Sequence, residues 1–69
     1  MTRHGVLYSH AYANRVDEHP DRLAAINTAA DTTNAQPGIE YELMSDDGDG
    51  WRSDTGETPE QVVARRWTW

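Results

Sequence analysis

The chain of 69 residues contains no cysteine, no lysine and no phenylalanine. Without cysteine there is no disulfide, no thiol nucleophile, no iron–sulfur cluster and no cysteine-ligated zinc, which fits a reducing compartment. No apolar run reaches the roughly 18 residues of a membrane span, and we expect no contact with a membrane. The start, Met1 to Gly5, is not followed by the apolar segment typical of a signal peptide. These absences predict a cytoplasmic protein.

The length predicts one domain, residues 1–69. A chain of this size buries only about 60% of the surface that its unfolded form exposes. Since ordering entropy opposes that gain, we expect a net stability of only about 3–5 kcal/mol. Formation of a homodimer, or docking on a partner, is one way to add to it.

The negative charge is concentrated in one part of the chain. Residues 31–60 carry nine acidic side chains against Arg52 alone, whereas residues 1–30 are balanced. Direct binding to nucleic acid needs clustered basic residues, so this distribution argues against it. It favours a protein partner with a basic surface.

Alternating side chains predict the strands. The clearest strand is 39–45, with Ile39, Tyr41 and Leu43 on a buried face and Glu40, Glu42 and Met44 on a solvated face. Residues 5–12 alternate in the same way, and residues 51–53 read as a short returning strand. The polar segment 14–19 is expected to be a connection.

Two helices are predicted from their start signals. Pro20 at the first helical position begins a helix over 21–33, whose narrow apolar stripe is formed by Leu23, Ile26 and Ala30. The sequence Thr58-Pro59-Glu60-Gln61 has the pattern of a capping box and begins a helix from Pro59 to about Trp67.

The order strand, helix, strand, strand, helix predicts a small α+β domain of two layers. We expect a three-stranded, mostly antiparallel sheet with both helices on one face.

The acidic segment Ser45-Asp46-Asp47-Gly48-Asp49-Gly50 places oxygen ligands at alternate positions, as a calcium loop does. A calcium loop of the EF-hand type also needs a glutamate at its twelfth position, and that position here is Gly56. We therefore expect a solvated hairpin tip. His4, His10 and His19 have spacings that match no helical or hairpin chelate, so no metal and no cofactor is predicted.

A catalytic function is not expected. Glu40 and Glu42 share one face of a strand and could pair as acid and base, but a domain of this size has little room for a substrate pocket. Ser9, Ser45 and Ser53 lack the context of a nucleophile elbow.

The sequence thus predicts a small acidic regulatory or inhibitory protein that binds another protein. In one form of this hypothesis its acidic surface imitates the phosphate row of DNA. The predicted contact residues are Glu40, Glu42, Asp46, Asp47, Asp49, Trp51 and Trp69. Carboxylates would supply electrostatic steering, and tryptophan is enriched at interface hot spots. The alternative is a structural or assembly subunit, such as a small oligomeric or virion protein.

Overall fold

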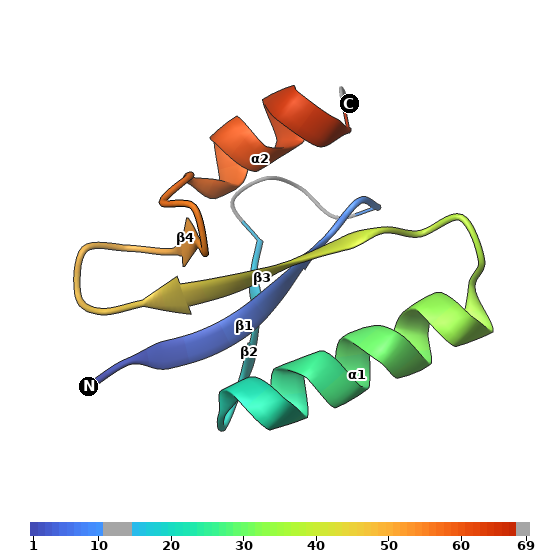
Figure 1. Ribbon diagram of the computed structural model, residues 1–69, viewed down its shortest axis with the longest axis horizontal. Coiled ribbons are helices and arrows are strands. Elements are labelled where there is room, and N and C mark those ends of the chain that lie inside the picture. Colours follow the sequence, from blue (N-terminus) through green and yellow to red (C-terminus); the bar gives the residue numbers. More distant parts are fainter. Residues whose placement is uncertain (11–14, 68–69) are drawn as a thin grey trace.

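The computed structural model describes residues 1–10 and 15–67, which form a four-stranded antiparallel sheet and two helices (Figure 1). The strands are β1 (Arg3–Tyr8), β2 (Asp17–His19), β3 (Tyr41–Asp46) and β4 (Arg52–Ser53), and the helices are α1 (Arg22–Ala35) and α2 (Pro59–Arg66). The strand order in the sheet is β2-β1-β3-β4. The α+β class is as predicted, with one strand more than expected.

The additional strand, β2, lies in the segment that the sequence indicated was a connection. It pairs with β1 in an antiparallel register that sets His4 opposite His19 and Val6 opposite Asp17. Its three residues are polar, and they are held at the sheet edge by backbone pairing rather than by an apolar pattern. Strand β1 itself begins at Arg3, earlier than predicted, and ends at Tyr8. Residues 11 and 12 of the predicted strand lie outside the described residues.

The two helices cover opposite faces of the sheet, which corrects the prediction of two layers. Figure 1 shows α1 below the sheet and α2 above it. One cluster of buried residues joins β1 and β3 to α2: Leu7, Met44, Val62, Val63 and Trp67. A second joins β1 to α1: Val6, Tyr8, Ala25 and Ala29, with Ile39, Tyr41 and Leu43 packed against it. Successive residues of a strand point to opposite faces, so Val6 and Leu7 enter different clusters.

Helix α1 begins one residue after its N-cap Asp21, whose side chain accepts a hydrogen bond from the Ala24 N–H at 2.8 Å. Pro20 therefore precedes the helix instead of starting it. The buried stripe is Ala25 and Ala29, one turn apart, whereas Leu23 is 67% exposed. The small alanine side chains are the ones that pack against the sheet.

Helix α2 matches its prediction closely. Thr58 is the N-cap, its hydroxyl accepts from the Gln61 N–H, and the Gln61 side chain accepts from the Thr58 N–H. Val62, Val63 and Trp67 are all buried. The capping box fixes the helix start, and the apolar positions then fix which side faces the sheet.

Candidate binding surface

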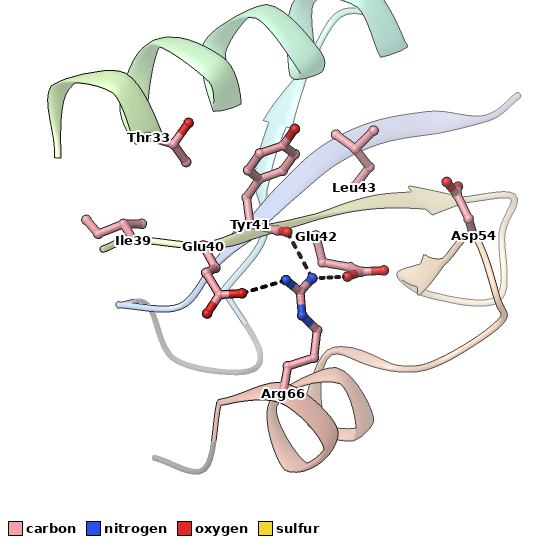
Figure 2. A pocket seen from close by; sticks show the side chains of 8 residues that line it. All are labelled: Thr33, Ile39, Glu40, Tyr41, Glu42, Leu43, Asp54 and Arg66. Carbon is pink, nitrogen blue, oxygen red and sulfur yellow. Dashed lines mark hydrogen bonds and ion pairs between the residues drawn. The ribbon is translucent and has the colours of Figure 1, made fainter. Parts of the chain in front are cut away.

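The outer edge of β3 borders a groove that the sequence did not predict. The groove is open and has a volume of about 480 Å³. It is lined by residues of α1, of β3 and the two residues before it, of the segment after β4, and of α2: Thr33, Ile39, Glu40, Tyr41, Glu42, Leu43, Asp54 and Arg66. We call this the β3 groove. Figure 2 shows the Tyr41 and Leu43 side chains on the side of α1 and the two glutamates on the side of α2.

Arg66, in the last turn of α2, contacts three groups of the β3 groove. Its guanidinium donates to the Glu40 carboxylate at 2.8 Å and to the Tyr41 carbonyl at 3.1 Å, and it pairs with the Glu42 carboxylate (Figure 2). Its side chain is 27% exposed. One arginine thus holds two carboxylates and one backbone carbonyl of the strand edge.

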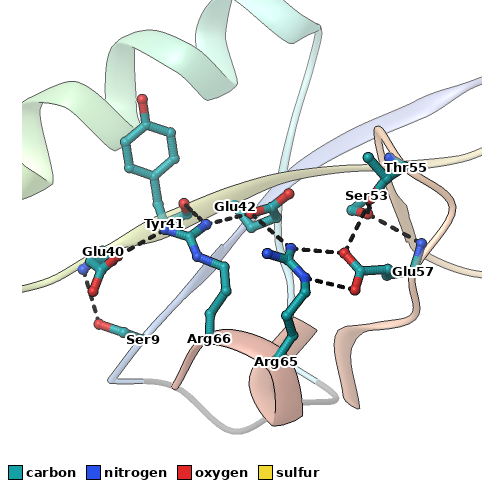
Figure 3. A network of polar contacts seen from close by, with 9 residues as sticks. All are labelled: Ser9, Glu40, Tyr41, Glu42, Ser53, Thr55, Glu57, Arg65 and Arg66. Carbon is teal, nitrogen blue, oxygen red and sulfur yellow. Dashed lines mark hydrogen bonds and ion pairs between the residues drawn. The ribbon is translucent and has the colours of Figure 1, made fainter. Parts of the chain in front are cut away.

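A polar network continues from this point toward the turn after β4 (Figure 3). Arg65 forms two hydrogen bonds of 2.8 Å to Glu57 and an ion pair of 3.9 Å to Glu42. Hydrogen bonding from Arg65 holds the pKa of Glu57 below its usual range. The buried Ser53 hydroxyl accepts from the backbone N–H groups of Thr55 and Glu57, which fixes this turn.

The remaining ion pairs tie distant segments together. Arg22, at the start of α1, forms two hydrogen bonds to Asp54, at 3.0 and 3.2 Å, and lowers the pKa of that carboxyl. Arg3 binds Glu18 at 2.6 Å, with the same effect on the pKa of Glu18. Within residues 1–10 and 15–67, six acidic side chains form an ion pair with an arginine: Glu18, Glu40, Glu42, Asp46, Asp54 and Glu57.

Glu40 and Glu42 were predicted to lie on a solvated face. Glu40 does, with 61% of its side chain exposed, but the Glu42 side chain is only 19% exposed. Helix α2 covers this face, and Met44, predicted beside the two glutamates, is fully buried beneath it. The prediction of a wholly solvated face is therefore wrong, because alternation along a strand does not reveal whether a second helix packs on the polar side.

Asp46 is a structural residue of the hairpin. It is 8% exposed, and one carboxylate oxygen accepts from the N–H groups of Gly48 and Gly50 at 2.7 and 3.1 Å. Its other oxygen accepts from Arg3 at 3.3 Å. Asp46 is therefore not part of the exposed contact surface predicted from the sequence, whereas Asp47 and Asp49 are exposed at the tip.

Trp51 is half-buried and packs against the α2-side cluster, with the Arg3 guanidinium 5.0 Å from its ring centre. Its ring is therefore sandwiched between the sheet and a cation rather than projecting toward solvent. Trp69, the other predicted aromatic contact, lies outside the described residues.

The structure brings His4 opposite His19, a pairing that sequence spacing did not indicate. Among residues 1–10 and 15–67, no group of three or more histidine, aspartate or glutamate side chains is placed to hold a metal ion. Within the same residues, no helix has the length and apolar character needed to cross a membrane.

The comparisons with known proteins give no family. No family model, no curated protein and no solved structure matches the sequence.

Proposed function

We propose that the protein is a small regulatory or inhibitory binding protein that contacts another protein through the β3 groove, without catalysing a reaction. The observation that carries this proposal is the groove itself. It combines apolar side chains on one wall, charged side chains on the other, and the backbone edge of a strand between them. Such a combination of apolar contact area and directional polar groups is typical of recognition sites.

The distribution of ion pairs favours a contact in the groove over imitation of DNA. Six carboxylates are matched by the chain's own arginines, so they do not present an uninterrupted row of negative charge. The exposed Asp47 and Asp49, at the hairpin tip, remain available to steer a basic partner at long range. In this proposal they affect the association rate more than the final contact.

The experiment compares two charge reversals that have equal effects on net charge. Glu40→Arg changes the β3 groove, and Asp47→Arg changes the hairpin tip. Each variant is used alongside the wild type to capture partners from a lysate, and the dissociation constant of any purified partner is then measured. We expect Glu40→Arg to weaken binding at least about tenfold, whereas Asp47→Arg mainly slows association.

Two results would contradict the proposal. Binding lost in Asp47→Arg and retained in Glu40→Arg would place the contact at the tip. A large closed oligomer, found by mass measurement of the protein alone, would support the alternative of a structural or assembly subunit.

A further inference from the structure

The backbone of β3 has an edge that the sheet leaves open. The backbone N–H of Ser9, next to β1, donates to the Glu40 carbonyl at 2.9 Å, so the backbone groups of Glu40 point toward β1. The direction of backbone hydrogen bonding alternates along a strand. The backbone N–H and C=O groups of Glu42 and Met44 therefore also point toward β1, and those of Tyr41 and Leu43 point away from it. Strand β4 pairs with β3 only at Met44 and Ser45. In the described part of the chain, no strand therefore pairs with β3 on the outer side of residues 41–43.

The two walls of the β3 groove specify what a strand added at this edge would carry. On the α1 side, the neighbouring side chains are the half-buried, apolar Ile39, Tyr41 and Leu43. On the α2 side they are Glu40 and Glu42 (Figure 2). Directly opposed side chains on adjacent strands contact each other, so an added strand would place apolar residues beside the first set and basic residues beside the second.

Arg66 already occupies the position that a basic residue of the partner would take. It binds both glutamates and also the outward-facing Tyr41 carbonyl. Charged side chains over an open strand edge are a common protection against unwanted pairing. An incoming arginine or lysine can replace Arg66 at the carboxylates, and the Tyr41 carbonyl then becomes free to accept from the backbone of the added strand.

We propose that the β3 edge binds an extended partner segment of alternating apolar and basic residues, which joins the sheet as a further strand and displaces Arg66. This inference rests on the proposed function, since it specifies the partner of the same groove. A second copy of the chain is a poorer occupant. Pairing of β3 with itself sets acidic side chains opposite acidic side chains, and each chain carries a net charge of −6.

The experiment uses the whole protein, labelled with ¹⁵N, and a capped heptapeptide of alternating lysine and valine as the probe. We expect the peptide to slow hydrogen exchange at the Tyr41 and Leu43 amides, whose N–H groups face outward. A peptide with glutamate in place of lysine should leave both amides unchanged. Peptides that are N-methylated on alternate residues provide the decisive arm. Methylation of the N–H groups that would point toward β3 should abolish binding, and methylation of the N–H groups that would point away should leave it intact. The reason is that only one edge of an added strand pairs with β3.

Arg66→Gln tests the displacement, and the adjacent Arg65→Gln is its matched control. Both variants remove one positive charge, but only Arg66 contacts Tyr41 and Glu40. We expect Arg66→Gln to bind the lysine–valine peptide about tenfold more tightly, and Arg65→Gln to change affinity less than about twofold. Equal effects of the two variants would overturn the displacement of Arg66.

The outcomes separate this inference from the proposed function. If the peptide slows amide exchange in the β3 groove regardless of N-methylation, strand addition is overturned but the groove remains the contact surface. If the peptide slows amide exchange only at the hairpin tip, both strand addition and the groove as contact surface are overturned. Concentration-dependent protection of Tyr41 and Leu43 without any peptide would identify a second copy as the occupant and overturn the partner segment. Absence of binding at millimolar peptide also overturns it.

Discussion

The ring of Trp51 lies directly over Gly5, a residue in the middle of β1. A methyl group at Gly5 would lie 3.1 Å from Cη2 of the Trp51 ring and 2.7 Å from both the Asp17 carbonyl oxygen and Cγ1 of Val16. Glycine is thus needed here for close approach, in an ordinary strand and not in a turn. The same contact explains why Trp51 is held against the sheet.

Gly5→Ala should therefore destabilise the fold. The added methyl group meets the backbone carbonyl oxygen of Asp17 in β2, which cannot move without disturbing the β1–β2 pairing, and also the Val16 side chain. We expect a loss of about 1–3 kcal/mol in the free energy of unfolding, measured by urea denaturation. An unchanged urea midpoint would show that β2 or Trp51 moves aside at no cost.

The same substitution at two leucines should have very different effects. Leu7 is fully buried in the α2-side cluster, whereas Leu23, predicted from the sequence to be in the core, is 67% exposed. Leu7→Ala should cost about 2–5 kcal/mol and unfold much of the protein. Leu23→Ala should stay within about 0.5 kcal/mol of the wild type. Thermal unfolding followed by circular dichroism measures both, and a large loss for Leu23→Ala would contradict the placement of α1.

The acidic residues of the hairpin should also separate into two classes. Asp46→Ala removes the acceptor for two backbone N–H groups and for Arg3, so we expect a loss of about 1–3 kcal/mol. Asp49→Ala, at the exposed tip, should change stability by less than about 0.5 kcal/mol. Equal stability of the two variants in urea denaturation would mean that the turn does not depend on Asp46.

Acid should weaken the fold through the paired carboxylates. Arginine hydrogen bonds lower the pKa of Glu18, Asp54 and Glu57 in the folded protein, so the unfolded chain binds protons more readily than the folded chain. Their contribution to stability is complete above the ordinary carboxylate pKa, about 4, and is lost as the pH falls through the lower folded pKa. The melting temperature should fall over that range.

The control for this pH dependence is Arg65→Gln, which removes the partner of Glu57. We expect its melting temperature to fall less steeply below pH 4 than that of the wild type. The Arg65 side chain is half-exposed and the Glu57 side chain is 22% exposed, so the pair is accessible to ions and added salt should reduce the difference between the two proteins. A difference that is unaffected by salt would mean that the pair does not act through its charges.

The sequence is sufficient to predict the elements with strong local signals. The capping box at Thr58 and Gln61 fixes the start of α2, and alternation along 39–45 indicates a strand. Strand β2 could not be predicted in this way, because it is three polar residues held only by pairing with β1. The sequence predicts the apolar stripe of α1 at Leu23, Ile26 and Ala30, whereas Ala25 and Ala29 are the residues that are buried. Alanine is a weak apolar signal, so the position of the larger side chains misled the prediction.

The contact surface was predicted less well than the fold. The acidic residues are visible in the sequence, but the arginines that pair with them can be far along the chain: Arg66 is 24 positions from Glu42, and Arg3 is 43 positions from Asp46. Two basic residues in the last turn of α2 were the available signal, and their ordinary interpretation is favourable interaction with the helix C-terminus. Only the packing of α2 across β3 converts Arg66 into a contact of the strand edge.

Strand β1 sits between two separate groups of packed side chains and supplies residues to both. Four of its six residues are buried, and the neighbouring β3 also reaches both groups, through Met44 on the α2 side and through Tyr41 and Leu43 on the α1 side. The two inner strands are therefore the common support of α1 and α2. A one-residue slip of β1 against β3 would send Val6 toward α2 and Leu7 toward α1 and so mismatch both groups together. We therefore expect the protein to fold and unfold as one cooperative unit, without a stable half.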